Sequence, residues 1–191
     1  MVASNLERNN PVAADPDFVA LRNLVAGLKD LASLDLRKRT RSHRVSVHLQ
    51  DLTEELRVII GQDWQDIDGE FNWQVPPEFP PVQADRQGLL QALLNLSQNS
   101  LRAVEHCDMR SLTIDTTLEA ERVILRICDT GSGIDSTEHL FQPFRPGADG
   151  SGLGLYVSRA LIQSFGGELR FVPTTTGCCF EIAMLPAAEQ L

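Results

Sequence analysis

Two asparagines one helical turn apart, Asn95 and Asn99, have types and spacing in this sequence that suggest chemistry. They lie in the run 84–104, where Gln91 and Arg102 continue the same line along one side. A solvated helix face usually carries Glu, Lys and Arg, because Asn is a weaker helix former. We therefore interpret the two asparagines as ligand contacts and not as part of a solvated face.

Two glycine clusters later in the chain could surround an anionic, nitrogen-bearing ligand. The first is Asp129-Thr130-Gly131-Ser132-Gly133-Ile134, and the second is Gly150-Ser151-Gly152-Leu153-Gly154-Leu155. Glycine lets backbone N–H groups approach a ligand closely, and N–H groups at a helix start bind phosphate. A lone glycine cluster is usually a turn, and neither a P-loop nor the dinucleotide-binding fingerprint is present. The glycines therefore indicate a binding site only together with the asparagines.

Together these segments resemble the ATP-binding domain of the sensor histidine kinases, in the superfamily shared with gyrase, the heat-shock ATPase chaperones and MutL. Residues 95–99 resemble the asparagine box, 129–134 the first glycine box, and 150–155 the second glycine box. Phe141-Gln142-Pro143-Phe144 resembles the phenylalanine box. The four boxes occur in the family's order, and the resemblance covers about residues 16 to 186.

The resemblance implies a role for each box residue in binding ATP and Mg²⁺. Asn99 would coordinate Mg²⁺ through its amide oxygen, and Asn95 would contact the phosphates or the hydration shell of the metal. These two are the expected catalytic residues. Asp129 would accept the exocyclic amine of adenine. Phe141 and Phe144 are expected to anchor the lid. The other expected ATP contacts are Arg102, Gly131, Gly133, Arg145, Gly150, Ser151, Gly152, Leu153 and Gly154.

The resemblance favours phosphoryl transfer over hydrolysis. Superfamily members that hydrolyse ATP carry a Glu one turn before the metal-binding asparagine, whereas Asn95 stands here and cannot act as a base. The expected function is the catalytic region of a two-component sensor histidine kinase. The family's phosphoacceptor histidine is followed by an acidic residue, which neither His43 nor His48 has. We therefore expect the acceptor to lie outside this chain, which would be a piece of a longer protein.

Two alternatives remain open. A serine-kinase anti-sigma factor of the same superfamily would lack a helix at residues 16–42 and usually has Glu in place of Asn95. A non-catalytic regulator could retain the fold and bind nucleotide and partners, although the intact boxes argue against it. The expected partners are a response regulator and, in the full-length protein, a second copy through the dimerisation hairpin. Membrane contact would require segments absent from this sequence.

The elements that position these residues follow from hydrophobic periodicity. Leu89, Leu93 and Leu96 predict a helix over 84–104, and further helices are predicted over 51–60 and 153–165. Apolar alternation or apolar runs predict strands at 45–49, 71–75, 82–84, 112–117, 122–128, 169–172 and 179–185. This order predicts an α+β fold, a two-layer α/β sandwich with a mixed sheet and helices on one face.

Three segments are predicted along the chain: a disordered lead-in at 1–14, a partial dimerisation helix at 15–43, and the ATP-binding domain at 44–188. The net charge of −9 argues against nucleic acid as a partner, because a phosphate backbone would be repelled. No apolar run reaches about 18 residues and no signal peptide is present, so we expect a cytoplasmic chain. Four cysteines without C-x-x-C spacing are expected to be reduced thiols: Cys107, Cys128, Cys178 and Cys179.

Overall fold

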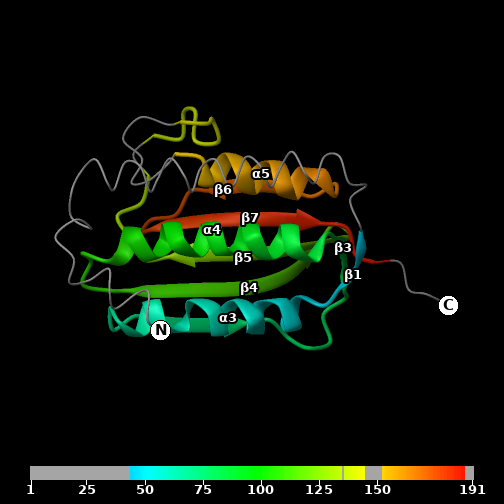
Figure 1. Ribbon diagram of the computed structural model, residues 1–191, viewed down its shortest axis with the longest axis horizontal. Helices are drawn as coiled ribbons and strands as arrows, with labels where there is room; N and C mark the ends of the chain where they lie inside the picture. Colours follow the sequence, from blue (N-terminus) through cyan, green and yellow to red (C-terminus); the bar gives the residue numbers. More distant parts are fainter. Residues whose placement is uncertain (1–43, 135, 145–151, 188–191) are drawn as a thin grey trace, which may run out of the picture.

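The computed structural model describes residues 44–134, 136–144 and 152–187 (Figure 1). Its main layer is a five-stranded sheet in the order β2-β4-β5-β7-β6. The β2–β4 pair is parallel and the other three pairs are antiparallel, so the predicted mixed sheet is confirmed. The strands are β2 (Glu70–Gln74), β4 (Ser111–Glu119), β5 (Arg122–Asp129), β6 (Glu168–Val172) and β7 (Cys178–Met184).

Three described helices form the second layer, on one face of this sheet (Figure 1). They are α3 (Leu49–Gln65), α4 (Arg86–Val104) and α5 (Gly154–Ser164). The core lies between the layers, because inward residues of the central strands pack against the leucines of α3 and α4. The predicted two-layer sandwich is therefore confirmed. None of the described helices is both long and apolar enough to cross a lipid bilayer.

Helix α4 forms because a cap and an apolar stripe agree. Asp85 caps its first turn, where one carboxylate oxygen accepts hydrogen bonds of 3.1 Å from the N–H groups of Gln87 and Gly88. Leucines and a valine at helical spacing then face the sheet, and all are fully buried: Leu89, Leu93, Leu96 and Val104. The helix begins at Arg86 and not at residue 84 as predicted, because Ala84 belongs to a strand.

That strand, β3 (Val82–Ala84), pairs with β1 (Val45–Val47) in a small antiparallel sheet. The predicted strand at 45–49 is wrong at its end, because Leu49 is the first residue of α3 and is only 2% exposed. Leu49 continues the apolar alternation of a strand, two residues after Val47. It also begins the apolar stripe of α3, and its burial on that helix favours the helical assignment. The helix also continues past the predicted end at residue 60, because Trp64 is buried on the same stripe.

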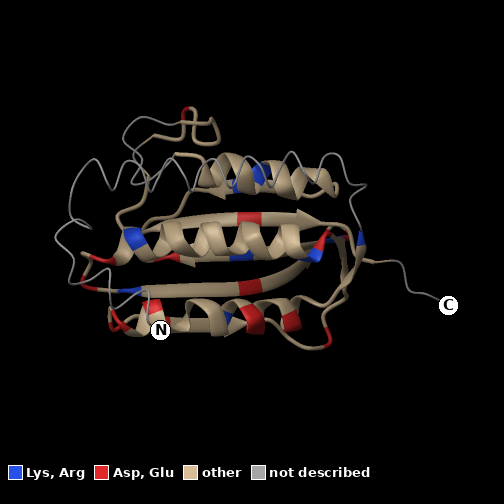
Figure 2. Ribbon diagram, viewed as in Figure 1, with Lys and Arg blue, Asp and Glu red and all other residues tan. Residues whose placement is uncertain are grey.

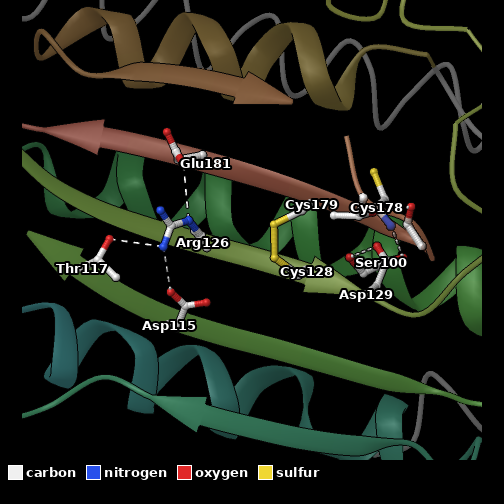
Figure 3. Close-up of a disulfide and its surroundings, with 11 residues drawn as sticks. Ser100, Asp115, Thr117, Arg126, Cys128, Asp129, Cys178, Cys179 and Glu181 are labelled. Atoms are coloured by element: carbon white, nitrogen blue, oxygen red, sulfur yellow. Dashed lines mark hydrogen bonds and ion pairs between the residues drawn. A yellow bond between two sulfur atoms is a disulfide. The ribbon is translucent and has the colours of Figure 1, made fainter. Parts of the chain in front are cut away.

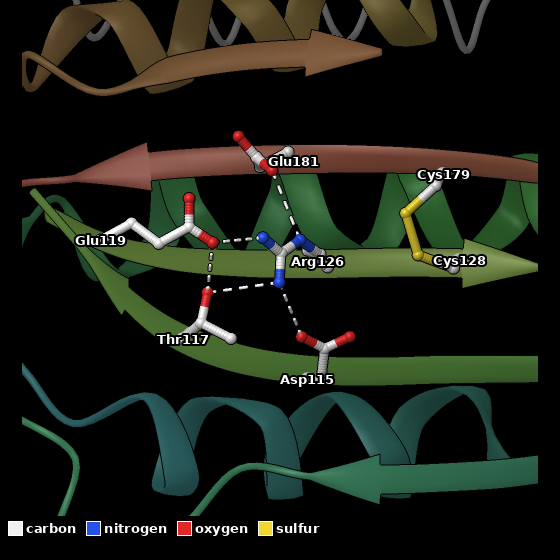
Figure 4. A network of polar contacts seen from close by, with 7 residues as sticks. All are labelled: Asp115, Thr117, Glu119, Arg126, Cys128, Cys179 and Glu181. Carbon is white, nitrogen blue, oxygen red and sulfur yellow. Dashed lines mark hydrogen bonds and ion pairs between the residues drawn. A yellow bond between two sulfur atoms is a disulfide. The ribbon is translucent and has the colours of Figure 1, made fainter. Parts of the chain in front are cut away.

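The face of the sheet away from α4 carries a polar network centred on β5 (Figure 4). The guanidinium of Arg126 forms ion pairs with carboxylates of both neighbouring strands: Asp115, Glu119 and Glu181. Glu119 also accepts a hydrogen bond from the Arg126 guanidinium, and this bond lowers the pKa of the Glu119 carboxyl. The network explains how a central strand can place an arginine at its middle, since a partly buried charge needs charged partners.

The same face carries a disulfide between Cys128 of β5 and Cys179 of β7 (Figures 3 and 4). The expectation of reduced cysteines is therefore wrong for this pair, although Cys107 and Cys178 are free as expected. Strand register is the physical reason, because the two residues are direct partners in the ladder and their Cα atoms are 4.0 Å apart. Cysteine spacing along the sequence contains no information on that register.

The predictions for residues 1–14 and 15–43 lie outside the described residues, and so does the end of the predicted 44–188 domain. The division of the chain into these three segments stays a prediction.

Candidate functional site

Asp129, the last residue of β5, is held by three donors and is only 6% exposed (Figure 3). The hydroxyl of Ser100 on α4 donates to Oδ2 at 2.8 Å. The backbone N–H groups of Gly131 and Cys178 donate to Oδ1 at 2.9 Å and 3.2 Å. Because a carboxylate oxygen can accept two hydrogen bonds, Oδ2 retains capacity to accept one from a ligand. The carboxylate is therefore oriented before a ligand arrives.

Burial raises the pKa of Asp129 above its ordinary value, and the hydrogen bonds from Ser100, Gly131 and Cys178 oppose this rise. A buried carboxylate with a shifted pKa and unused acceptor capacity is typical of a functional site. The geometry therefore agrees with the role expected for Asp129 as an acceptor of a ligand amine.

The first glycine cluster packs directly onto α4. A Cβ added to Gly131 would lie 2.6 Å from Cβ of Ala103 and 2.8 Å from its carbonyl oxygen. Any side chain at this position would therefore displace the loop from the helix. The Ser132 N–H also donates to the Ala103 carbonyl at 3.4 Å, and Gly133 adopts a φ of 78°. The structure thus explains Gly131 by close packing, and contact of these glycines with a ligand stays a prediction.

Asn95 and Asn99 lie on the same side of α4 as Gln91 and Arg102, with which they form hydrogen bonds. Oδ1 of Asn95 accepts a 3.1 Å hydrogen bond from Gln91, whereas its Nδ2 is buried and has no partner in the described part of the chain. A buried donor without a partner typically costs about 1–3 kcal/mol, which a bound ligand could offset. Asn99 is half-buried, and its Oδ1 accepts a long hydrogen bond of 3.4 Å from Arg102.

Asn99 also faces the second glycine cluster. A Cβ added to Gly154, the first residue of α5, would lie 4.0 Å from Nδ2 of Asn99. Of the predicted contacts in this cluster, Gly152 adopts a φ of 65° and Leu153 is buried. The Leu153 side chain packs with Val157 and Leu161 of α5, so only its backbone could contact a ligand. Arg145, Gly150 and Ser151 lie outside the described residues, so their roles stay predictions.

The phenylalanine box is anchored at one of its two aromatic residues. The ring of Phe141 packs edge-on against Phe180 of β7, with 6.3 Å between the centroids. Cζ of Arg159 on α5 lies 4.9 Å from the centre of the same ring. Phe144, in contrast, is 67% exposed, and residues 145–151 of the lid lie outside the described residues, so its role as a lid anchor stays a prediction.

Three residues at the site were missed by sequence reasoning: Ser100, Gly177 and Cys178. Ser100 continues the apolar stripe of α4 one turn after Leu96, and a hydroxyl on such a stripe is a signal that could have identified it. Gly177 adopts a φ of 70°, and a Cβ there would lie 1.8 Å from the carbonyl oxygen of Asp129. Cys178 contributes through its backbone, which no sequence pattern indicates.

One helix therefore organises the whole site. Along α4, Ser100 contacts the strand-end carboxylate, Ala103 contacts the first glycine cluster, and Asn99 faces the second. No charged residue occurs on α4 between Arg86 and Arg102, so amides and hydroxyls form its polar surface (Figure 2). A fixed carboxylate, two amides and the N-terminus of a helix form a set of groups that suits a base and a phosphate on one ligand.

The described residues contain no cluster of three or more His, Cys, Asp or Glu side chains that could hold a metal ion. The donor set instead fits Mg²⁺ held mainly by phosphate oxygens and water, because the Asn99 amide oxygen is a suitable single protein ligand for a hard cation. Among the described residues the Asn99 oxygen accepts only a long hydrogen bond, which leaves it available for such a contact.

Residues 84–189 match the family described as histidine kinase-, DNA gyrase B- and HSP90-like ATPases. The sensor protein FixL of Bradyrhizobium diazoefficiens is 30% identical over 195 residues, which cover 100% of this chain and 39% of FixL. The chain thus spans less than half the length of that relative.

Solved structures of histidine kinases have the same fold. The catalytic domain of the histidine kinase ThkA is 25% identical, with a TM-score of 0.67 over 75% of this chain and 96% of that domain. A complex of ThkA with the response regulator TrrA contains a chain that is 20% identical, with a TM-score of 0.71 over 94% of this chain and 53% of that one. At that identity the second likeness concerns the fold alone.

Proposed function

Because the chain belongs to the family of histidine kinase-, DNA gyrase B- and HSP90-like ATPases, which implies ATP binding, we propose that it is the catalytic region of a two-component sensor histidine kinase. Its reaction would transfer the γ-phosphoryl group of ATP to a histidine outside residues 1–191. One observation carries the proposal: α4 places Ser100 at Asp129 and Asn99 at the start of α5.

The adenine would bind at the end of β5. Asp129 Oδ2 would accept a hydrogen bond from the exocyclic amine, for which the carboxylate is already oriented by Ser100 and two backbone N–H groups. Guanine has a carbonyl oxygen where adenine has that amine, and a carbonyl facing a carboxylate would be repelled. This contact would therefore select adenine.

The triphosphate would lie along α4 towards α5. The free N–H₂ hydrogens of Asn95 would donate to a phosphate oxygen or to metal-bound water, which would satisfy a buried donor. Asn99 would offer its amide oxygen to Mg²⁺, and the cation would neutralise charge on the phosphates during transfer. Arg102, at the end of the same side of the helix, would add a guanidinium contact, and the N-terminus of α5 would add backbone N–H groups.

Transfer is favoured over hydrolysis by the residue at position 95. Hydrolysis requires a base that activates water, and an amide cannot take a proton at neutral pH. The Asn95 side chain lies where such a base would stand, one turn before Asn99. Positioning of ATP and its metal is sufficient for phosphoryl transfer when a separate acceptor is supplied.

The proposed partners are a response regulator and a second copy of the full-length protein. The ThkA–TrrA complex supports the first, since a chain of this fold binds a response regulator there. Both ATP and response regulators occur in the cytoplasm, so the domain would act there.

Labelled ATP tests the proposal directly. The chain should bind ATP with Mg²⁺, and the full-length protein should incorporate label that is lost in acid, as a phosphohistidine loses it. Acid-stable label would instead indicate a serine kinase of the anti-sigma type. Binding of ATP without any transfer in the full-length protein would indicate a non-catalytic regulator.

A further inference from the structure

The disulfide on the polar face lies next to the nucleotide site. Cys128 and Cys179 are direct partners in the antiparallel ladder of β5 and β7, although 51 positions separate them in the chain (Figure 3). The next pair of the same ladder is Asp129 and Cys178. Asp129, which follows Cys128, is therefore the carboxylate of the site. Cys178, which precedes Cys179, donates a backbone hydrogen bond to it.

The Asp129–Cys178 pair is the last of the β5–β7 ladder at this end. Asp129 is also paired on its other side, with Leu112 of β4. Cys178 has no second partner among the described strands, because the β6–β7 ladder ends at Val172 and Cys179. The start of β7 is thus held against the site from one side only.

End pairs of a ladder open more readily than central ones, because fewer interactions must break. When Cys178 moves away, Asp129 loses the 3.2 Å hydrogen bond from its backbone N–H. A covalent bond at the neighbouring pair limits this opening, since Cys179 cannot separate from Cys128. With two thiols in place of the bond, the opening can extend past Cys179.

We propose that Cys128 and Cys179 form a thiol–disulfide exchange site whose oxidation state controls how firmly the adjoining site holds a nucleotide. The second half of this statement rests on the proposed ATP binding. The oxidised pair would stabilise the binding-competent arrangement of Asp129, and reduction would loosen it.

The reductant would be a dithiol. One of its thiolates attacks Sγ of Cys128, which is half-buried, whereas Cys179 is only 3% exposed. The disulfide breaks, and Cys179 leaves as a thiolate that takes up a proton. The second thiolate of the dithiol then attacks the mixed disulfide and releases Cys128. Two electrons pass to the protein, and the dithiol becomes a disulfide. A small-molecule disulfide reverses both steps.

The other two cysteines are free thiols outside this pair. Cys178 lies on the helix-covered face, and burial raises its pKa to about 12, so it remains a thiol. Cys107 follows α4, and its S–H donates to the Ala103 carbonyl at 3.4 Å. Cys107 is a free thiol outside the β5–β7 ladder, so it provides a matched control.

The test uses the whole chain, treated with either oxidised glutathione or reduced dithiothreitol. Alkylation under denaturing conditions, followed by intact mass measurement, should find two free thiols after oxidation and four after reduction. Hydrogen exchange without nucleotide should be about tenfold slower at the Cys178 amide in the oxidised form, the scale of one hydrogen bond to a charged group. Exchange at Leu125, in the middle of β5, should change little.

Calorimetry should then show ATP binding about tenfold tighter in the oxidised form, for the same reason. The double variant Cys128→Ser/Cys179→Ser should behave as the reduced protein and ignore dithiothreitol. Cys107→Ser should respond as the wild type does.

Four free thiols after oxidation would overturn the inference. Equal rates of hydrogen exchange at the Cys178 amide in the oxidised and reduced forms would overturn it as well. Equal ATP affinity in the two forms would overturn its control of binding. If hydrogen exchange at the Cys178 amide differs between the two forms but neither form binds ATP, the proposed function fails. The coupling of the disulfide to Asp129 then still stands.

Discussion

Ser100 Oγ donates a hydrogen bond of 2.8 Å to Asp129 Oδ2, and both side chains are buried. The two residues lie 29 positions apart, one on α4 and the other at the end of β5 (Figure 3). This hydrogen bond joins α4, which carries Asn95 and Asn99, to the carboxylate that would bind the amine of adenine. Because the carboxylate is oriented in advance, a ligand would lose less affinity to the ordering of the site.

Ser100→Ala should reduce both stability and nucleotide affinity. The substitution leaves the buried Asp129 carboxylate without one donor, which typically costs about 1–3 kcal/mol of unfolding free energy. Urea denaturation measures this loss. Ser97→Ala is the matched control, because the Ser97 hydroxyl is buried on the same helix without a partner in the described structure. Equal losses in the two variants would contradict the role assigned to Ser100.

Asp129→Asn should weaken ATP binding by about 1–3 kcal/mol, the scale of a hydrogen bond to a charged group. It should also reduce the preference for ATP over GTP, because the amide can both donate and accept. Competition between the two nucleotides, measured by calorimetry, tests the assignment. If GTP competes as well as ATP against the wild type, Asp129 does not select adenine.

The raised pKa of Asp129 predicts opposite effects of pH on binding and on stability. ATP affinity should fall as the pH decreases through this pKa, which lies above the ordinary value of 3.8, because the protonated group is a poorer acceptor. Over the same interval the folded state binds the proton more tightly than the unfolded state, so this group's contribution to stability decreases as the pH rises. Asp129→Asn should lose both dependences; a variant that retains them would implicate another group.

Asn99→Ala should remove the Mg²⁺-dependent part of ATP affinity and leave the fold intact. The side chain is half-buried, and its only hydrogen bond within the described part of the chain is the long one with Arg102, so its loss costs little stability. Titration with and without Mg²⁺ measures the effect. Gln98→Ala is the control, because it removes an exposed amide from the same helix. Similar Mg²⁺ dependence in wild type and Asn99→Ala would exclude the metal role.

Gly177→Ala should be strongly destabilising, by about 3 kcal/mol or more, because it combines a positive φ with a clash against backbone. The added Cβ would lie 1.8 Å from the Asp129 carbonyl oxygen, at a φ of 70°. Gly61→Ala in α3 meets nothing within 4 Å and should instead stabilise the protein by about 1 kcal/mol. Thermal melting of both variants distinguishes them, and a stable Gly177→Ala protein would contradict the close approach.

The sequence by itself determined which segments form helices and strands, and it supplied the residues that are predicted to form the site. The leucine stripe of α4 and the alternation of β4 and β5 are local patterns, and a core can bury only residues that recur at the period of their element. The order of the four boxes is likewise a property of the chain alone. Leu49 shows the limit of this reasoning, because it satisfies the periods of a strand and of a helix.

Only the tertiary structure decided which residues meet across elements. The packing of α4 on the sheet brings Ser100 into hydrogen-bond contact with Asp129. The register of β5 and β7 pairs Cys128 with Cys179 and brings Gly177 close to the Asp129 carbonyl. Register depends on how distant strands pair, and a slip of one residue would turn every side chain to the other face of the sheet. No local pattern encodes that choice over 51 positions of chain, so the disulfide and the anchoring of the carboxylate could be found only in the folded protein.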